Sequence, residues 1–159
     1  MFDFHQSTNN DSVLRITVWL LLPVICLYAL YIQVHGEISP GGGFQAGVIL
    51  SVAYILFLFV FGLYNAENFI PSNLLSKLAG VGVMIYIVVG FSTIFLGGKF
   101  LDYNRFSFFS SAPQELGLFV VELGIGICIF GSMCSIIFTF YSLLSDNERR
   151  DLTDDIGKY

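Results

Sequence analysis

Long apolar runs separated by short polar segments dominate this chain. Glu122 is the only ionisable residue well inside any of the four runs, which cover about 13–34, 44–64, 74–97 and 116–144. A run of about 20 apolar residues crosses the hydrocarbon core of a bilayer. The runs are continuously apolar and do not alternate as the strands of a membrane β-barrel do. Because each backbone amide in lipid must be satisfied within its own segment, the pattern predicts an all-α integral membrane protein with four transmembrane helices.

Composition supports this fold class. Of the 159 residues, 55% are hydrophobic and only 12% are charged, whereas roughly a quarter are charged in a soluble domain. The runs leave too little chain for a separate soluble domain. We therefore expect one membrane domain over 1–144 and a polar C-terminal tail over 145–159. The mixed charge of that tail is typical of a solvated, disordered segment.

The basic residues predict the orientation in the membrane. An even number of spans places both termini on one side, and that side carries five basic residues against two on the other. The two sets are Arg15, Lys77, Arg149, Arg150 and Lys158, against Lys99 and Arg105. By the positive-inside rule, both termini are expected in the cytoplasm. Residues 1–12 contain no Lys or Arg, so the first run is expected to be a retained helix and not a signal peptide.

The polar turn between the first two runs, 35–47, is rich in glycine. Ser39 followed by Pro40 is typical of a helix start, and small residues then recur every four positions, a spacing that lets another helix approach closely. No Lys-Ser/Thr pair follows the glycines, which excludes a phosphate-binding P-loop. The predicted helix-packing residues of this turn are Pro40, Gly41, Gly42, Gly43, Phe44 and Gly47.

The last run has two different faces. At 100° per residue its small residues form one stripe, which contains Gly117, Gly124, Cys128, Gly131 and Ser135. Glu122 lies on the opposite side, and a charged carboxylate at mid-membrane costs about 2.5–3.5 kcal/mol. We therefore expect Glu122 to face protein or water and the stripe to face a close helix. Protein cover on both faces would require more than four helices, which indicates a larger complex.

Two further features concern the third run and the connection after it. Gly90, Thr93 and Gly97 lie three and four residues apart and predict a second packing groove. The 98–115 connection is rich in aromatic residues that suit the bilayer interface, and we expect an interfacial or partly re-entrant segment. Its aromatic residues include Phe100, Tyr103, Phe106, Phe108 and Phe109.

Three polar residues are candidates for an ion path or proton transfer: Glu122, His35 and Glu37. The 35–47 turn and the start of the last run emerge on the same side, and Glu122 lies roughly 10 Å inward from Glu115 at 1.5 Å per residue. The three side chains are therefore expected to share one polar cluster. The alternatives are a protonated Glu122 bonded to a backbone carbonyl, and His35 and Glu37 as interfacial residues that orient the turn.

Other function classes find no support in the sequence. It contains no nucleophile–base arrangement, and its three cysteines lack the spacing of a metal site. We expect no enzyme activity, no metal and no cofactor. The net charge of −5 disfavours nucleic-acid binding.

The turn motif His35-Gly36-Glu37 with Pro40-Gly41-Gly42-Gly43-Phe44-Gln45-Ala46-Gly47 resembles the signature of the B-type (MnhB/MrpB) subunit of Mrp-type Na⁺/H⁺ antiporters. Glu122-Leu123-Gly124-Ile125-Gly126 is similar to the acidic segment in the last span of that family. The resemblance covers about 13–144, with the same four-span layout. The common version has glycine in place of Ala46 and often aspartate in place of Glu122.

The resemblance implies a small subunit of a multi-subunit complex in the bacterial inner membrane that exchanges Na⁺ for protons. Its partners would be the lipid bilayer, the large antiporter-like subunits and other small membrane subunits. The B-type subunit supports assembly and is a candidate to line part of the cation path. The alternative is a purely structural helix-packing subunit of a membrane-bound hydrogenase or complex-I-like arm. A self-contained multidrug exporter is disfavoured because its essential carboxylate would lie in the first span, which has none.

Overall fold

The computed structural model describes residues 8–36, 41–103 and 113–156. Within these ranges the chain is mostly helical, and four helical stretches are long and apolar enough to cross a membrane: Ser12–Val34, Gly43–Phe61, Ser72–Phe95 and Gln114–Ser145. This confirms the predicted all-α fold with four potential membrane spans. The cytoplasmic location of the termini stays a prediction.

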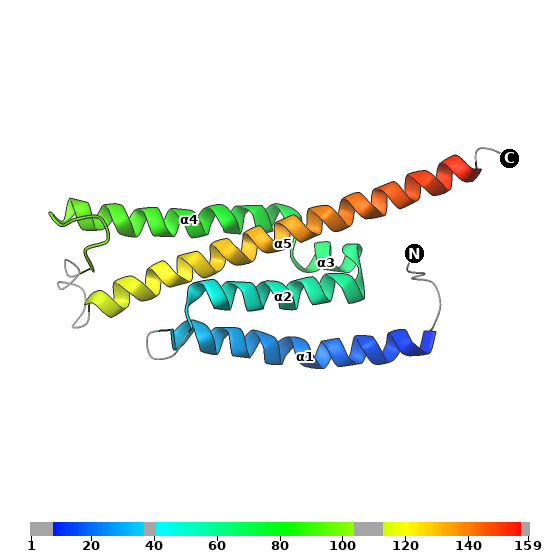
Figure 1. Ribbon diagram of the computed structural model, residues 1–159, viewed down its shortest axis with the longest axis horizontal. Coiled ribbons are helices and arrows are strands. Elements are labelled where there is room, and N and C mark those ends of the chain that lie inside the picture. Colours follow the sequence, from blue (N-terminus) through cyan, green and yellow to red (C-terminus); the bar gives the residue numbers. More distant parts are fainter. Residues whose placement is uncertain (1–7, 37–40, 104–112, 157–159) are drawn as a thin grey trace.

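The four long helices lie in one row, and their order in space differs from their order in the chain. Neighbours in the row are α1, α2, α5 and α4 (Figure 1). α5 therefore runs between α2 and α4, and α1 packs at the outer edge against α2. The elements are α1 (Thr8–Val34), α2 (Gly43–Phe61), α3 (Leu63–Phe69), α4 (Ser72–Phe95) and α5 (Pro113–Ile156).

The position of α5 corrects one inference from the sequence. We expected the two faces of the last span to need cover from other subunits, but α2 covers the Glu122 face and α4 covers the small-residue stripe. The reasoning assumed a compact bundle in which each helix keeps one outward face. In a row of helices, an inner helix has a neighbour from the same chain on both sides.

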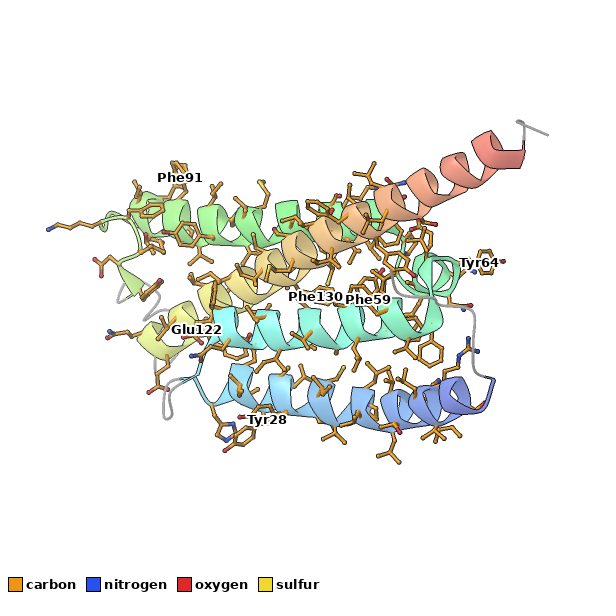
Figure 2. The ribbon with its side chains drawn as sticks, turned by 45° about the vertical axis from the view of Figure 1, so that its right-hand side comes forward. Tyr28, Phe59, Tyr64, Phe91, Glu122 and Phe130 are labelled. Carbon is orange, nitrogen blue, oxygen red and sulfur yellow. The ribbon has the colours of Figure 1, made fainter. Side chains whose placement is uncertain are left out.

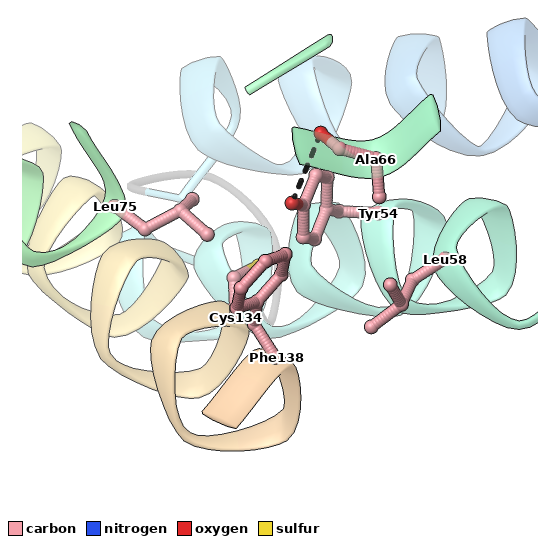
Figure 3. Packing of buried hydrophobic residues seen from close by; sticks show 6 residues of the cluster. All are labelled: Tyr54, Leu58, Ala66, Leu75, Cys134 and Phe138. Atoms are coloured by element: carbon pink, nitrogen blue, oxygen red, sulfur yellow. Dashed lines mark hydrogen bonds between the residues drawn. The ribbon is translucent and has the colours of Figure 1, made fainter. Parts of the chain in front are cut away.

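The connection between α2 and α4 contains a short helix, α3, which the sequence pattern did not predict. Gly62 separates it from α2 with a φ of 84°, a conformation that favours glycine. The Tyr54 hydroxyl fixes α3 by donating to the carbonyl oxygens of Ala66 at 3.5 Å and Ile70 at 3.2 Å. Figure 3 shows the bond to Ala66 inside a buried cluster that joins α2, α3, α4 and α5: Tyr54, Leu58, Ala66, Leu75, Cys134 and Phe138.

α5 is longer than the last apolar run. It contains 44 residues and continues as helix through the expected tail to Ile156, so the prediction of a disordered tail is wrong for 145–156. In Figure 1 this last part projects beyond the ends of the other helices. Good helix formers and charges of both signs at helical spacing explain why a polar segment continues the helix.

The start of the aromatic connection folds back on α4. A Cβ atom on Gly90 would overlap the ring of Phe100, and the Thr93 hydroxyl donates to the carbonyl oxygen of Lys99 at 2.9 Å and accepts from the backbone N–H of Leu101 at 3.0 Å. The expected groove at Gly90 and Thr93 is therefore filled by the chain's own connection and not by another helix. Phe106, Phe108 and Phe109 lie outside the described residues.

Candidate functional site

The glycine turn brings the start of α2 into backbone contact with α5. Gly42 caps α2 with a φ of 133°, where a side chain would be strained. A Cβ atom on Gly43 would coincide with the backbone carbonyl of Glu122 and lie 2.9 Å from its Cα atom. The two helices can cross this closely only because residue 43 has no side chain.

The close approach continues one turn further along both helices. A Cβ atom on Gly47 would lie 2.6 Å from the carbonyl oxygen of Gly126. Ser51, the next small residue on this face, is buried and its hydroxyl donates to the Gly47 carbonyl oxygen at 2.7 Å. The Gly43, Gly47 and Ser51 face of α2 is thus its contact with α5, by the packing mode that small residues permit in lipid.

The carboxylate of Glu122 lies against the turn that joins α1 and α2. A Cβ atom on Gly36 would lie 2.9 Å from one carboxylate oxygen, and one on Gly42 would lie 3.4 Å from the other. Figure 2 shows Glu122 where α5 crosses the first turn of α2. The unpaired amides at the N-terminus of a helix favour negative charge. Glu122 is half-buried, so it faces protein at its inner end, as expected.

Gln33 completes this polar region, and the sequence reasoning missed it. Its side chain, in the last turn of α1, is only 8% exposed, and its Nε2 atom has no hydrogen-bond partner among the described residues. A Cβ atom on Gly126 would lie 3.0 Å from both the Gln33 Oε1 atom and the Gly43 carbonyl oxygen. Gln33 therefore contacts α5 one turn beyond Glu122. The available signal was a single uncharged polar residue near the end of an otherwise apolar run.

The other predicted residues of the turn take different places. The His35 ring stacks on Tyr31 with ring centroids 4.2 Å apart, and its Nδ1 atom lies 3.1 Å from the Tyr31 carbonyl oxygen. Phe44 is exposed on the outside of α2. Gly41 packs on Ile32, since a Cβ atom there would lie 3.2 Å from its side chain. Glu37 and Pro40 lie outside the described residues, so their approach to Glu122 stays a prediction.

The stripe on the opposite face of α5 packs mainly on α4. A Cβ atom on Gly82 of α4 would overlap the carbonyl oxygen of Gly124, and one on Gly131 would lie 2.6 Å from the Leu75 carbonyl oxygen. Gly117 differs from this pattern, because it meets the ring of Tyr103 in the connection and not a helix.

The arrangement is a half-buried carboxylate beside a buried amide, between three helices. It supports proton exchange or weak binding of a monovalent cation, since carboxylate and amide oxygens are hard ligands. Among the described residues no group of three or more His, Cys, Asp or Glu side chains is placed to hold a metal ion.

Comparison with known proteins places this geometry in a family. Residues 13–135, which include the turn and Glu122, match the family described as "Domain related to MnhB subunit of Na+/H+ antiporter". The chain belongs to this MnhB-related family. It is thus a multi-pass membrane protein of a transporter family, whose members are subunits of a multi-subunit antiporter.

Individual relatives of the MnhB-related family align over most of their length. The B-type subunit of the Na(+)/H(+) antiporter of Bacillus subtilis is 27% identical over 136 residues, which are 79% of this chain and 94% of the relative. The antiporter protein mnhB2 of Staphylococcus haemolyticus is 28% identical over 132 residues, or 81% of this chain and 93% of the relative. The corresponding Na(+)/H(+) antiporter protein of Alkalihalophilus pseudofirmus is 25% identical over 132 residues, or 76% and 90%. The family resemblance seen at the turn is therefore confirmed.

Proposed function

We propose that this chain is the B-type subunit of a multi-subunit monovalent cation/proton antiporter, and that Glu122 accepts a proton or a cation during transport. The observation that carries the proposal is the place of the Glu122 carboxylate, which lies against the glycine turn inside the segment matched by the family. The role is transport by a complex, and we assign no chemical reaction to this chain.

The surroundings of Glu122 support such a role. Gln33 and Gly43 offer uncharged oxygen atoms one helical turn along α5, and the start of α2 favours negative charge beside the carboxylate. A Na⁺ ion held there would gain one full charge and neutral oxygen ligands, whereas a proton needs only the carboxylate. His35 and Glu37, from the same turn, are proposed to connect Glu122 with water on that side of the membrane.

The proposed partners are the other membrane subunits of the antiporter. The outer side of α1 is apolar and open along much of its length, with Trp19 70%, Leu20 71% and Leu27 67% exposed. Lipid and neighbouring subunits are proposed to cover this helix in the bacterial inner membrane. Na⁺ and H⁺ are the proposed transported ions.

The test measures Na⁺-dependent ΔpH in membrane vesicles that contain the assembled complex. Glu122→Gln removes the ionisable group and keeps the size of the side chain, so antiport should be lost or strongly reduced, while Glu122→Asp should retain part of it. Glu115→Gln is the matched control, because Glu115 is exposed in the first turn of the same helix and should keep full activity.

Assembly separates this proposal from a purely structural role. The other subunits should co-purify with the Glu122→Gln chain as they do with the wild type. Full antiport by a normally assembled Glu122→Gln complex would remove Glu122 from the transport path. In that case only close-packing substitutions such as Gly43→Leu or Gly124→Leu would abolish function, through loss of assembly.

A further inference from the structure

The first half of α1 forms one wall of a large apolar cleft, away from Glu122. The cleft has a volume of about 1110 Å³, and its other walls come from α2, α3 and α5. Trp19, Pro23 and Cys26 line it from α1, and Ala53 and Phe130 lie on the opposite walls. Figure 1 shows these parts of α1, α2 and α3 at the same end of the molecule.

Arg15 is the only charged residue among the described residues that line the cleft. It lies at the outer end of the cleft, near the start of α1, and Phe69 and Ile70 of the α3 segment line the same end. Tyr54 also lines the cleft, but its hydroxyl donates to the carbonyl oxygens of Ala66 and Ile70. The wall is therefore apolar except for one cation at its mouth.

The length of the cleft matches one leaflet of a bilayer. The α1 residues that line it run from Arg15 to Cys26, or about 16 Å at 1.5 Å per residue. Half of a hydrocarbon core is about 15 Å. Beyond Cys26, Ala29 and Gln33 are buried, so the cleft does not continue across the membrane. A partner's transmembrane helix would need a groove of twice this length, whereas a lipid of one leaflet would not.

We propose that the cleft binds one anionic phospholipid, with an acyl chain against Trp19 and Phe130 and the headgroup phosphate on the Arg15 guanidinium. An acyl chain gains little on leaving the bilayer for an apolar cleft, because both environments are apolar. Selectivity therefore comes from the headgroup, and basic residues beside a helix cleft attract anionic lipids. The orientation predicted from the basic residues places this headgroup in the cytoplasmic leaflet. The site is independent of the proposed transport role, since Glu122 is not part of it.

The only tryptophan of the chain reports on this cleft, because Trp19 lines it one turn from Arg15. The purified full chain is reconstituted in phosphatidylcholine vesicles with increasing fractions of brominated-chain phosphatidylglycerol or brominated-chain phosphatidylcholine. Bromine quenches tryptophan on contact. We expect the anionic lipid to quench Trp19 at about a fivefold lower fraction than the zwitterionic lipid, the preference that one basic residue provides.

Arg15→Gln should make the two brominated lipids equally effective, and Arg15→Lys should keep the preference. Lys77→Gln is the matched control, because Lys77 is exposed at the start of α4 and does not line the cleft. Unchanged helix content by circular dichroism shows that each variant is folded.

A second pair of variants tests the cleft without changing its charge. Ala53→Phe fills the wall and should weaken quenching by the anionic lipid, whereas Val52→Phe on the exposed side of α2 should not. Equal quenching by both lipids in the wild type would overturn the proposal, as would a preference that survives Arg15→Gln. Weak quenching by both lipids together with cross-linking of two chains at Cys26 would place a second copy in the cleft and refute lipid binding.

Discussion

Replacing Gly43 with alanine tests the contact on which the candidate site depends. The new methyl group would coincide with the Glu122 carbonyl and lie 2.9 Å from the Glu122 Cα atom. Carbon atoms in contact prefer about 3.5–4.0 Å, so α2 and α5 must separate by about 1 Å or more. Neither contact is the mobile end of a side chain, so rotation of a side chain cannot relieve the overlap.

The expected cost is about 1–3 kcal/mol, the usual range for overpacking. The matched control is Gly80→Ala in α4, where no atom lies within 4 Å of the added Cβ. That substitution should gain up to about 1 kcal/mol from helix propensity. The two alanine variants, which add the same methyl group, should therefore differ by about 2–4 kcal/mol.

The measurement is the free energy of unfolding of the full chain in mixed detergent micelles, titrated with dodecyl sulfate and followed by circular dichroism. Co-purification of the partner subunits with each variant gives a second readout. If the two variants had free energies of unfolding within about 0.5 kcal/mol, the range of ordinary surface substitutions, the close crossing of α2 on α5 would be refuted.

Three other substitutions test separate contacts. Tyr54→Phe removes the donor to the Ile70 carbonyl oxygen at 3.2 Å and should cost about 1 kcal/mol in unfolding titrations, with faster hydrogen exchange in α3. Thr93→Val removes the acceptor of the Leu101 N–H, and that amide should exchange about tenfold faster; an unchanged rate would contradict the assignment. Gly82→Ala places a methyl group against the backbone of α5 and should lower the thermal stability of the chain, whereas a neutral result would show that α4 and α5 are not in backbone contact.

The sequence predicted the elements well because lipid imposes one rule on each span by itself. Apolar length alone identifies a membrane helix, and the four stretches found in the structure follow the four runs. It also predicted that Glu122 and the glycine turn would lie at the same end, because antiparallel neighbours return to the same side. Their actual contact, through Gly36 and Gly42, required the structure.

The order of the helices could not be predicted, because periodicity identifies a face but not its neighbour. The two faces of α5 look equally suited to a partner from another subunit, yet α2 and α4 occupy them. Gly90 shows the same limit on a smaller scale. Its small size fits a helix as well as an aromatic ring, and the structure places Phe100 there.

Short polar signals were also missed for a physical reason. Gln33 is one uncharged residue among apolar ones, and its role depends on Gly126, 93 positions later in the chain. The helix α3 is apolar enough to look like the end of the second run, and only the positive φ of Gly62 separates it from α2. Such breaks depend on backbone conformation, which composition does not report.

The unbroken length of α5 links events in water to events in the membrane. Its 44 residues make a rod of about 66 Å at 1.5 Å per residue, more than twice the hydrocarbon thickness of about 30 Å. Glu122 sits near one end and the charged segment near the other. A protein that grips the aqueous end and tips it would therefore move the acid as well, with the rod acting as a lever. Regulation of transport from outside the bilayer would then need no hinge and no second messenger.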